Sequence, residues 1–548
     1  MKKIYILSLL SLMLLLSGFV RSDSDVYFEM SKSIDIFGKI YKEVTLNYVD
    51  DVNPKEFMLS GIKGMLESLD PYTVYIDENM KKDIDLMTKG KYGGIGASVG
   101  IRNDNVTIVD LLEGYSAERQ GIRIGDIIRK VNDEEISVDN YNELSGLIKG
   151  EPGTVVNLEL EREGEESHLH FEIILEEVVI KNLTYYGFVP ENSNNVYLKL
   201  SSFSRSAGDE IRKALSELKR QREIKSIILD LRSNPGGLLD QAIDVSEKFL
   251  KKDQLIVSVI GRDSSKITRY KSKEEPVGGD AKLVVLVNGY SASASEIVAG
   301  AIQDHDRGVI LGNQSFGKGL VQTLLPLSYN TSLKITTARY FTPSGRCIQK
   351  IDYSSNRDIL NSIQIDKSKE FKTDNNRDVF AAGGIEPDTV ISNHSESPLI
   401  RDLLARGMFF RFATNYYNSR QNIDLNMVSD EELYDKFLEY LKEVDFSASS
   451  KSIRIIDQLR ESLSENEESD DVINSIDLLE GKLKAVQKSG LSDARGEITT
   501  EIRKELAGRI FGRDGRVKES LKTDKQFTAA LDIVHQETIY SNLLAFGE

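Results

Sequence analysis

The sequence predicts a multidomain α/β protein with a helical segment at each end. Three observations lead to this assignment. Strands and helices alternate through residues 179–395, which is typical of βα units around a largely parallel sheet. Short glycine-rich strands with one helix before the last strand fill residues 91–178 and predict a compact barrel. Residues 23–90 and 396–548 show helical spacing of apolar residues instead.

The bulk composition describes a folded chain and argues against a nucleic-acid partner. With 548 residues the chain is too long for one ordinary core, and 40% of its residues are hydrophobic. The formal net charge of −17 opposes binding to phosphate backbones, which requires a dense basic face. Cys347 is the single cysteine and the five histidines are scattered, so we expect no disulfide, no metal and no cofactor.

The first 22 residues resemble a secretory signal. Lys2 and Lys3 precede an apolar run over residues 4–20, and Arg21 and Ser22 restore polarity. We expect cleavage near residue 22; an uncleaved anchor helix is the alternative. Both interpretations place the mature chain outside the cytoplasm, in a periplasmic or other extracytoplasmic location.

The two helical segments have open roles. Residues 23–90 are too short to bury a core and are expected to pack on a neighbouring segment or a second subunit. In residues 396–548 the sequence predicts capping boxes at Ser429–Glu432 and Thr523–Gln526, with a charged break around residues 462–471. This extension could mediate oligomerisation, shield a cleft or bind an adaptor.

Three serines stand at alternate positions in the stretch GYSASASEIVAGAIQD, residues 289–304. Ser293 and Glu296 fit a capping box, which is a purely structural explanation. The buried strand before this turn and the helix after it would also place a serine beside helix-start N–H groups, which can stabilise an oxyanion. The residues alone do not choose among Ser291, Ser293 and Ser295.

A serine nucleophile needs a base, and Lys318 is the candidate. His305 would lie roughly 18 Å along the same helix from Ser293, too far to act. A lysine can serve when its amine is neutral, and Gly317 and Gly319 allow the backbone a close approach. A turn lysine in solvent is the structural alternative. The turn RSNPGG, residues 232–237, could supply a second oxyanion donor or be an ordinary βα turn.

The stretch from Gly312 to Lys318 also matches most of a phosphate-binding loop. Gly319 follows where that motif requires the Ser or Thr that binds magnesium, and the next residues alternate like a strand and reach Pro326. An NTPase is therefore disfavoured.

The segment GYSASASEIVAGAIQDHDRGVILGNQSFGKGLVQ closely resembles the catalytic segment of the carboxyl-terminal processing, or tail-specific, proteases. LDLRSNPGG resembles their glycine turn, with Ser233 in place of the more usual Asn. YFTPSGRCIQ, GGIEPD and MLESLDPYTVY are similar to further motifs of the family, so the resemblance covers roughly residues 35–395. It implies a serine protease core of the ClpP/crotonase-like α/β type.

The resemblance also implies roles for individual residues. Ser293 would be the nucleophile, Lys318 its general base and Gln322 the residue that orients the lysine. The backbone N–H groups of Gly237 and Ala294 would form the oxyanion hole.

The barrel at residues 91–178 resembles a PDZ domain of the protease-linked kind. The N–H groups of Gly94, Ile95 and Gly96 would bind a peptide carboxylate, and Leu144 and Ile148 would line the pocket for a side chain.

The function expected is an exported serine endopeptidase that recognises exposed protein C-termini and cleaves near them, with a PDZ domain that can gate the core. The alternative is a PDZ adaptor with an inactive core, and the helical regions could support a homo-oligomer or an adaptor contact.

Overall fold

The computed structural model describes residues 23–545 except for 79, 81–89, 352, 354–369, 382, 393–396, 421–422, 445, 447–454, 457, 461–471, 473 and 480–489. The predicted signal and the whole of the predicted break at 462–471 lie outside the described residues. Among the residues described, no helix has both the length and the apolar character needed to cross a membrane. The chain divides into two compact units, and the first contains residues 1–81, 322–336 and 353–361.

The first unit contains a helical hairpin and the distal part of a β-hairpin. Its elements are α2 (Asp23–Asn47), α3 (Pro54–Glu67) and β1 (Val74–Ile76), and β1 pairs antiparallel with the start of β18 (Ser332–Phe341). Asn53 caps α3 by accepting hydrogen bonds from the N–H groups of Lys55 and Glu56. α3 buries none of its side chains, and α2 leaves several large apolar side chains exposed.

The glycine-rich part forms a small β domain of the second unit. One sheet has the order β3-β4-β5-β7-β8, with β6 on β5, and β2 pairs with β9. Its strands are β2 (Lys91–Gly94), β3 (Ala97–Arg102), β4 (Asn105–Leu111), β5 (Ile127–Val131), β6 (Glu134–Glu135), β7 (Val155–Glu161), β8 (Leu169–Ile174) and β9 (Glu176–Val179). The helices α5 (Ser116–Arg119) and α6 (Tyr141–Leu147) complete it.

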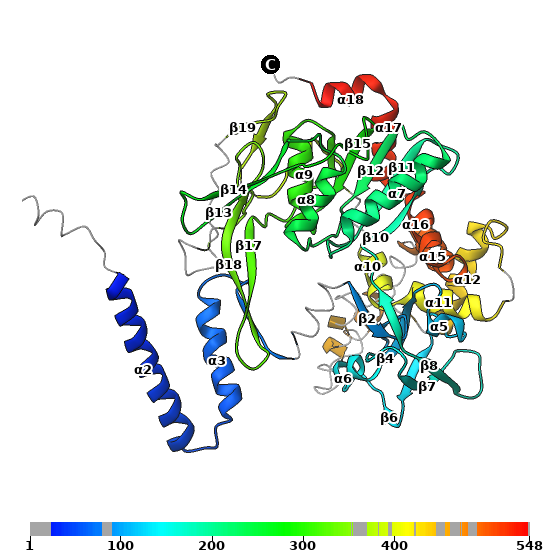
Figure 1. The fold of residues 1–548 in the computed structure, drawn as a ribbon. Coiled ribbons are helices and arrows are strands. Elements are labelled where there is room, and N and C mark those ends of the chain that lie inside the picture. Colours follow the sequence, from blue (N-terminus) through cyan, green and yellow to red (C-terminus); the bar gives the residue numbers. More distant parts are fainter. Residues whose placement is uncertain are drawn as a thin grey trace, which may run out of the picture. The chain divides into compact units, whose positions relative to one another are not determined.

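A six-stranded sheet of order β10-β11-β12-β15-β16-β21 forms the centre of the second unit (Figure 1). Only β10 is antiparallel to its neighbour in this sheet, and β12 and β15 are almost entirely buried, as parallel strands covered on both faces must be. The strands are β10 (Leu183–Phe188), β11 (Asn195–Leu200), β12 (Ser226–Asp230), β15 (Lys282–Val287), β16 (Val309–Gly312) and β21 (Thr389–Val390). The predicted α/β class is confirmed.

Three helices and a second sheet cover one side of this centre. The helices are α7 (Ala207–Gln221), α8 (Leu239–Glu247) and α9 (Ala294–Asp304), which share one large core with the sheet. β13 (Leu255–Gly261) pairs with β14 (Ile267–Lys271) and with the end of β18, and β17 (Leu320–Pro326) pairs with β18. β19 (Glu370–Lys372) and β20 (Asp378–Phe380) form a separate hairpin.

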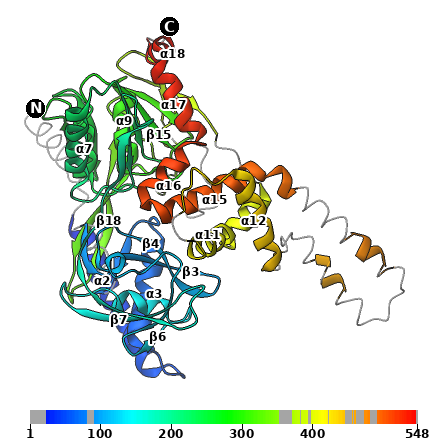
Figure 2. The same cartoon turned by 90° about the vertical axis from the view of Figure 1, so that its right-hand side faces the viewer.

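The C-terminal part is helical, as predicted, but it is not confined to a separate bundle. α10 (Pro398–Ala405), α11 (Met408–Asn418), α12 (Asp430–Glu443) and α15 (Arg495–Ile510) build their own core. α16 (Gly512–Leu521) and α17 (Lys525–His535) pack instead on the other face of the central sheet, beside β15 (Figure 2), and α18 (Glu537–Leu543) follows.

The two predicted helix caps in this part have different outcomes. Ser429 caps α12 by accepting a hydrogen bond from the N–H of Glu432, which confirms that start. The prediction of Thr523 was wrong by one residue. Asp524 caps α17, because its carboxylate accepts from the N–H groups of Gln526 and Phe527.

Candidate active site

Ser293 stands at the turn between strand β15 and helix α9. Its backbone adopts φ 55° and ψ −110°, a conformation that is strained for a residue with a Cβ. Strained strand-to-helix turns of this kind expose the nucleophile above the sheet in α/β-hydrolases. Ser293 is partly buried.

Ser291 and Ser295 have structural roles. Both are fully buried. The hydroxyl of Ser291 donates to the carbonyl of Leu231 at 2.8 Å, and that of Ser295 donates to the carbonyl of Asn234 at 2.9 Å. Their hydroxyls therefore tie the turn at residues 288–293, which we call the nucleophile turn after the role predicted for Ser293, to the turn that follows β12.

Glu296 joins the backbone of Ser293 to that of Lys318. One carboxylate oxygen accepts hydrogen bonds from the N–H of Ser293 at 2.8 Å and from the N–H of Lys318 at 2.9 Å. The other oxygen accepts from the N–H of Gly317 at 2.7 Å and from the hydroxyl of Ser315 at 2.6 Å. Glu296 is fully buried, so these four donors replace water around its charge.

The burial of Glu296 affects its ionisation. Desolvation raises the pKa of the Glu296 carboxyl to about 7, although the four hydrogen bonds act in the opposite direction. The sequence predicts half of this arrangement, the reciprocal bond of a capping box. The link to residues 315–318 was not predicted.

Tyr340 makes a second bridge between the same two segments. Its hydroxyl donates to the carbonyl of Ser293 at 3.2 Å and also contacts the carbonyl of Lys318, and its own N–H donates to the carbonyl of Gly319 at 3.0 Å. Tyr340 is buried at the end of β18. Ser293 and Lys318 are thus held on two segments that share a buried carboxylate and a buried phenol.

His305 is engaged elsewhere, as the sequence led us to expect. It ends α9, where its ring contacts Asp374 and the carbonyl of Leu255, each at 2.7 Å. The segment after Lys318 continues as strand β17 and not as the helix that a phosphate-binding loop requires.

The turn at residues 232–237 lies directly against the nucleophile turn. A Cβ added to Gly236 would stand 2.9 Å from the nitrogen of Ala294 and 3.0 Å from the Cβ of Ser293, so only glycine allows this approach. The N–H of Gly236 is occupied by the side chain of Asn234 at 2.9 Å. By contrast, the N–H of Gly237 makes none of the hydrogen bonds found among the described residues, and Ala294 is the first residue of α9, whose N–H has no intrahelical acceptor.

Gln322 belongs to the first unit, whereas Ser293 and Lys318 belong to the second. It lies in β17, where its side-chain amide donates to Thr336 Oγ1 at 3.3 Å. Its expected role beside Lys318 stays a prediction.

The residues predicted to bind a peptide carboxylate lie at the entry to β3. Gly94 ends β2, and Gly96 has φ 80°. β3 is the terminal strand of its sheet, which is the kind of strand beside which PDZ domains bind a peptide. Ile95, Leu144 and Ile148 are buried in the core of this domain, and the hydroxyl of Tyr141 on α6 donates to the carbonyl of Val99 on β3 at 3.0 Å.

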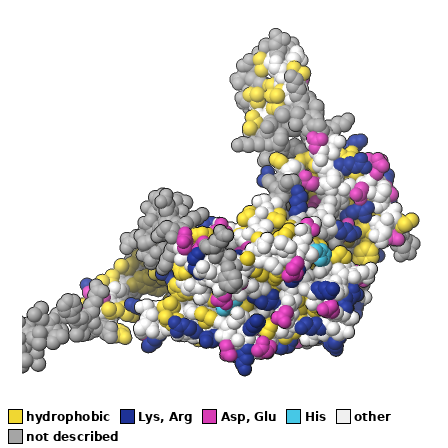
Figure 3. Space-filling model, turned by 90° about the horizontal axis from the view of Figure 1, so that it is seen from above, with side chains coloured by type: hydrophobic (Ala, Val, Ile, Leu, Met, Phe, Trp, Pro, Cys, Tyr) yellow, Lys and Arg dark blue, Asp and Glu magenta, His cyan; other side chains and the backbone are white. Residues whose placement is uncertain are grey.

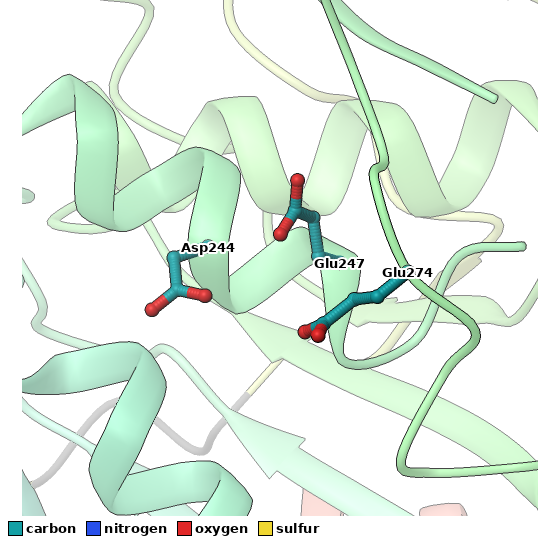
Figure 4. A group of neighbouring side chains, drawn as sticks. All are labelled: Asp244, Glu247 and Glu274. Atoms are coloured by element: carbon teal, nitrogen blue, oxygen red, sulfur yellow. The ribbon is translucent and has the colours of Figure 1, made fainter. Parts of the chain in front are cut away.

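A cluster of three carboxylates away from Ser293 is paired with a buried lysine. Asp244, Glu247 and Glu274 lie close together (Figure 4). The fully buried Lys248 donates to Glu274 at 2.8 Å and to Asp244, and Arg212 also pairs with Glu274. The hydrogen bond from Lys248 holds the pKa of Glu274 below its ordinary value. The cluster is therefore built as an ion-pair network around Lys248.

A cavity of about 530 Å³ lies away from Ser293. Residues 110–124 of the small β domain and residues 508–514 of α15 and α16 supply most of its lining. Neither Ser293 nor Lys318 borders it, so it is not the site of the chemistry inferred for the nucleophile turn.

On the face drawn in Figure 3, basic side chains are interspersed with acidic ones.

Comparisons with known proteins agree with this geometry. The description "Peptidase family S41" matches residues 194–359, "PDZ domain" matches residues 107–162 and "Activating protease CtpB N-terminal domain" matches residues 19–80. The helical part at residues 399–534 matches "Probable PDZ-protease, C-terminal helical domain".

Two similar proteases decide the family. A carboxy-terminal-processing protease of Bartonella bacilliformis is 38% identical over 58% of this chain and 73% of its own length. The carboxy-terminal processing protease CtpA of Bacillus subtilis is 34% identical over 61% of this chain and 72% of its own length. The chain belongs to the carboxy-terminal processing protease family. It is therefore a serine-type peptidase with a PDZ domain, as the resemblance implied.

Solved structures are also similar to parts of the chain. The photosystem II D1 C-terminal processing protease is 25% identical, with a TM-score of 0.36 over 64% of this chain and 85% of that protein. The PDZ domain of a carboxy-terminal protease from Vibrio cholerae, solved with a peptide, is 27% identical, with a TM-score of 0.15 over 16% of this chain and 97% of that domain.

Proposed function

We propose that the protein is an exported endopeptidase that cleaves near the C-termini of protein substrates with Ser293 and Lys318. In its neutral form, the Lys318 amine takes the proton from Ser293 Oγ as this oxygen attacks the scissile carbonyl carbon. The oxyanion accepts hydrogen bonds from the N–H groups of Gly237 and Ala294. The C–N bond then breaks, Lys318 returns the proton to the leaving amine, and water releases the acyl group from Ser293.

The single observation that carries this proposal is the pair of bridges between the nucleophile and base segments. Glu296 binds the N–H groups of Ser293 and Lys318 with one oxygen, and Tyr340 contacts both carbonyls. Gln322 would orient the lysine, as the family resemblance implies.

The PDZ domain would bind the substrate's terminal carboxylate at Gly94, Ile95 and Gly96 and gate the core. The position of β3 at the end of its sheet supports this role. The bond from Tyr141 to Val99 occupies one β3 acceptor. The name of the Vibrio cholerae domain, solved with a peptide, is consistent with peptide binding.

Export rests on the first 22 residues, which have the pattern of a signal peptide. The mature chain would then work in the periplasm or another extracytoplasmic compartment. The size of the purified mature protein, measured by mass spectrometry, tests cleavage near residue 22.

A homo-oligomer through the first helical unit is proposed from its surface. Tyr27 is 70% exposed, Met30 53% and Ile34 69%, and their spacing of three, four and seven residues puts them on one face of α2. Apolar patches of this kind mark interfaces. Light scattering should give a dimer or larger species for the wild type and a monomer for Tyr27→Glu combined with Ile34→Glu; a monomeric wild type would contradict the proposal.

The experiment for the catalytic proposal compares four proteins on an unfolded substrate with an apolar C-terminal tail. Wild type should cleave it, and Ser293→Ala and Lys318→Met should not. Ser295→Ala is the matched control and should keep activity. The adaptor alternative predicts that wild type binds the tail peptide and leaves the substrate intact.

A further inference from the structure

Residues 512–535 form a layer of the protease core, although they follow the helical bundle in the sequence. Val517, Leu521 and Phe527 belong to one buried cluster with residues of β10, β11, β12, β15 and β16. The ring of Phe527 packs edge-on against Tyr197 with centroids 5.4 Å apart. Without α16 and α17, one face of the central sheet would be open to water.

The first turn of α17 reaches the end of strand β12. Asp524 caps α17 with one carboxylate oxygen, and its other oxygen pairs with the guanidinium of Arg232 at 2.7 Å. Gln526 is fully buried, and its side-chain oxygen accepts from Arg232 at 2.9 Å while its amide donates to the carbonyl of Ile391 at 2.6 Å. The N-cap residue and the second residue of α17 therefore hold one arginine.

Arg232 is also fixed from the side of the sheet. Its guanidinium binds both carboxylate oxygens of Asp230, the last residue of β12, and the hydroxyl of Tyr197 donates to the same carboxylate. Burial alone would raise the pKa of Asp230, but the charge and hydrogen bonds of Arg232 hold that pKa below its ordinary value. Removal of one acidic partner would unbalance a largely buried set of charges.

Arg232 begins the turn that carries the proposed oxyanion donor. The next residue, Ser233, has φ 60° and donates its N–H to Asn288 at 2.9 Å. Asn234 accepts the N–H of Ala292 at 3.0 Å, and Gly237 follows three residues later. The backbone of Arg232 is therefore connected to the N–H of Gly237 by a short turn whose residues also bond to the segment before Ser293.

We infer that the start of α17 supports the active site. Asp524 and Gln526 are positioning residues that hold the turn at residues 232–237, which carries the proposed oxyanion donor, through their contacts with Arg232. The inference rests on the proposed role of Gly237. It assigns a task to the C-terminal extension that an independent bundle would not have: the start of α17 sets the geometry in which the transition state is stabilised.

Asp524→Asn is the decisive variant, because Asn caps a helix as well as Asp does but carries no charge for Arg232. The matched control is Lys282→Met. Lys282 holds the other end of α17, donating to the carbonyl of Val534 and pairing with Glu537, each at 2.7 Å. Gln526→Leu, with similar volume, is a second variant in case Asp524→Asn does not fold, which circular dichroism would reveal.

The readouts are kcat and KM for a tailed substrate, and the affinity of a peptide aldehyde, whose adduct with a serine places its oxygen in the oxyanion hole. The inference predicts that kcat and aldehyde affinity both fall, on the order of 10- to 100-fold, with KM unchanged in Asp524→Asn or Gln526→Leu. Lys282→Met should keep wild-type values.

Values of kcat within twofold of wild type in folded Asp524→Asn and Gln526→Leu would overturn the inference. An equal loss of kcat in Lys282→Met would also overturn it, since that result would mean that docking of α17 alone matters. Failure of the proposed function would give a different result. In that case the wild type would not bind the aldehyde through Ser293, and Ser293→Ala would bind it as well as the wild type does.

Discussion

Replacement of Glu296 by Gln tests the buried bridge between the nucleophile and the base. A Gln amide keeps one acceptor oxygen, which can serve the N–H groups of Ser293 and Lys318. Its NH₂ group then faces Ser315 and Gly317. The Ser315 hydroxyl can rotate to accept, but the buried N–H of Gly317 loses its partner, at a cost of about 1–3 kcal/mol.

The pH dependence gives this prediction a sign. The pKa of Glu296 is raised from 4.5 to about 7 in the folded protein, so its proton stabilises the fold fully below pH 4.5, and this contribution is lost as the pH rises through 7. The difference between the two pKa values corresponds to about 3 kcal/mol. A Gln side chain does not titrate, so its contribution to stability does not change with pH. Glu296→Gln should therefore be clearly less stable than wild type at pH 5, and the gap should narrow by about 2–3 kcal/mol by pH 8.

The assay is urea unfolding at pH 5 and pH 8, followed by circular dichroism because the chain contains no Trp. Turnover of a tailed peptide at pH 8 is measured in parallel, and kcat should fall on the order of 10-fold because the two segments lose part of their common anchor. Asp304→Asn is the control: it is a buried carboxylate at the other end of α9, paired with Arg346. A stability gap for Glu296→Gln that is the same at both pH values would refute the reasoning.

Three further predictions concern the surroundings of Ser293. Gly236→Ala should lower kcat on the order of 100-fold with KM little changed, because the new Cβ would meet the carbonyl oxygen of Ala292 at 2.6 Å; wild-type kcat would contradict this. Ser295→Ala should lower the free energy of unfolding by about 1 kcal/mol and keep kcat. Ser291→Ala should do the same, and loss of turnover in a folded form of either variant would mean that the wrong serine was chosen.

The predictions of the domain order and of the nucleophile rest on different physical grounds. Alternation of strands and helices is a local pattern, and it identified the α/β core without any family resemblance. The choice of Ser293 needed the resemblance. The structure adds an independent reason to prefer Ser293, because the hydroxyls of Ser291 and Ser295 donate hydrogen bonds to carbonyls of the neighbouring turn.

The contacts that complete the site could not be predicted, because they join segments far apart in the chain. Glu296 carries a visible local signal as a capping residue, yet its bonds to Gly317 and Lys318 depend on how β16 and β17 return to the helix. Arg232 and Asp524 form an ion pair, although most of the core and the whole helical bundle lie between them in the sequence. Thr523 and Asp524 are both good caps, so local propensity could not decide between them.

The most direct test of the account is to find the acyl group. Wild type is mixed with a slowly hydrolysed peptide ester, the reaction is quenched in acid after the first turnover, and peptide mapping locates the added mass. The account predicts that the acyl group is on Ser293 and that Lys318→Met gives none. An acyl group on another residue, or steady cleavage with no covalent intermediate on Ser293, would contradict it.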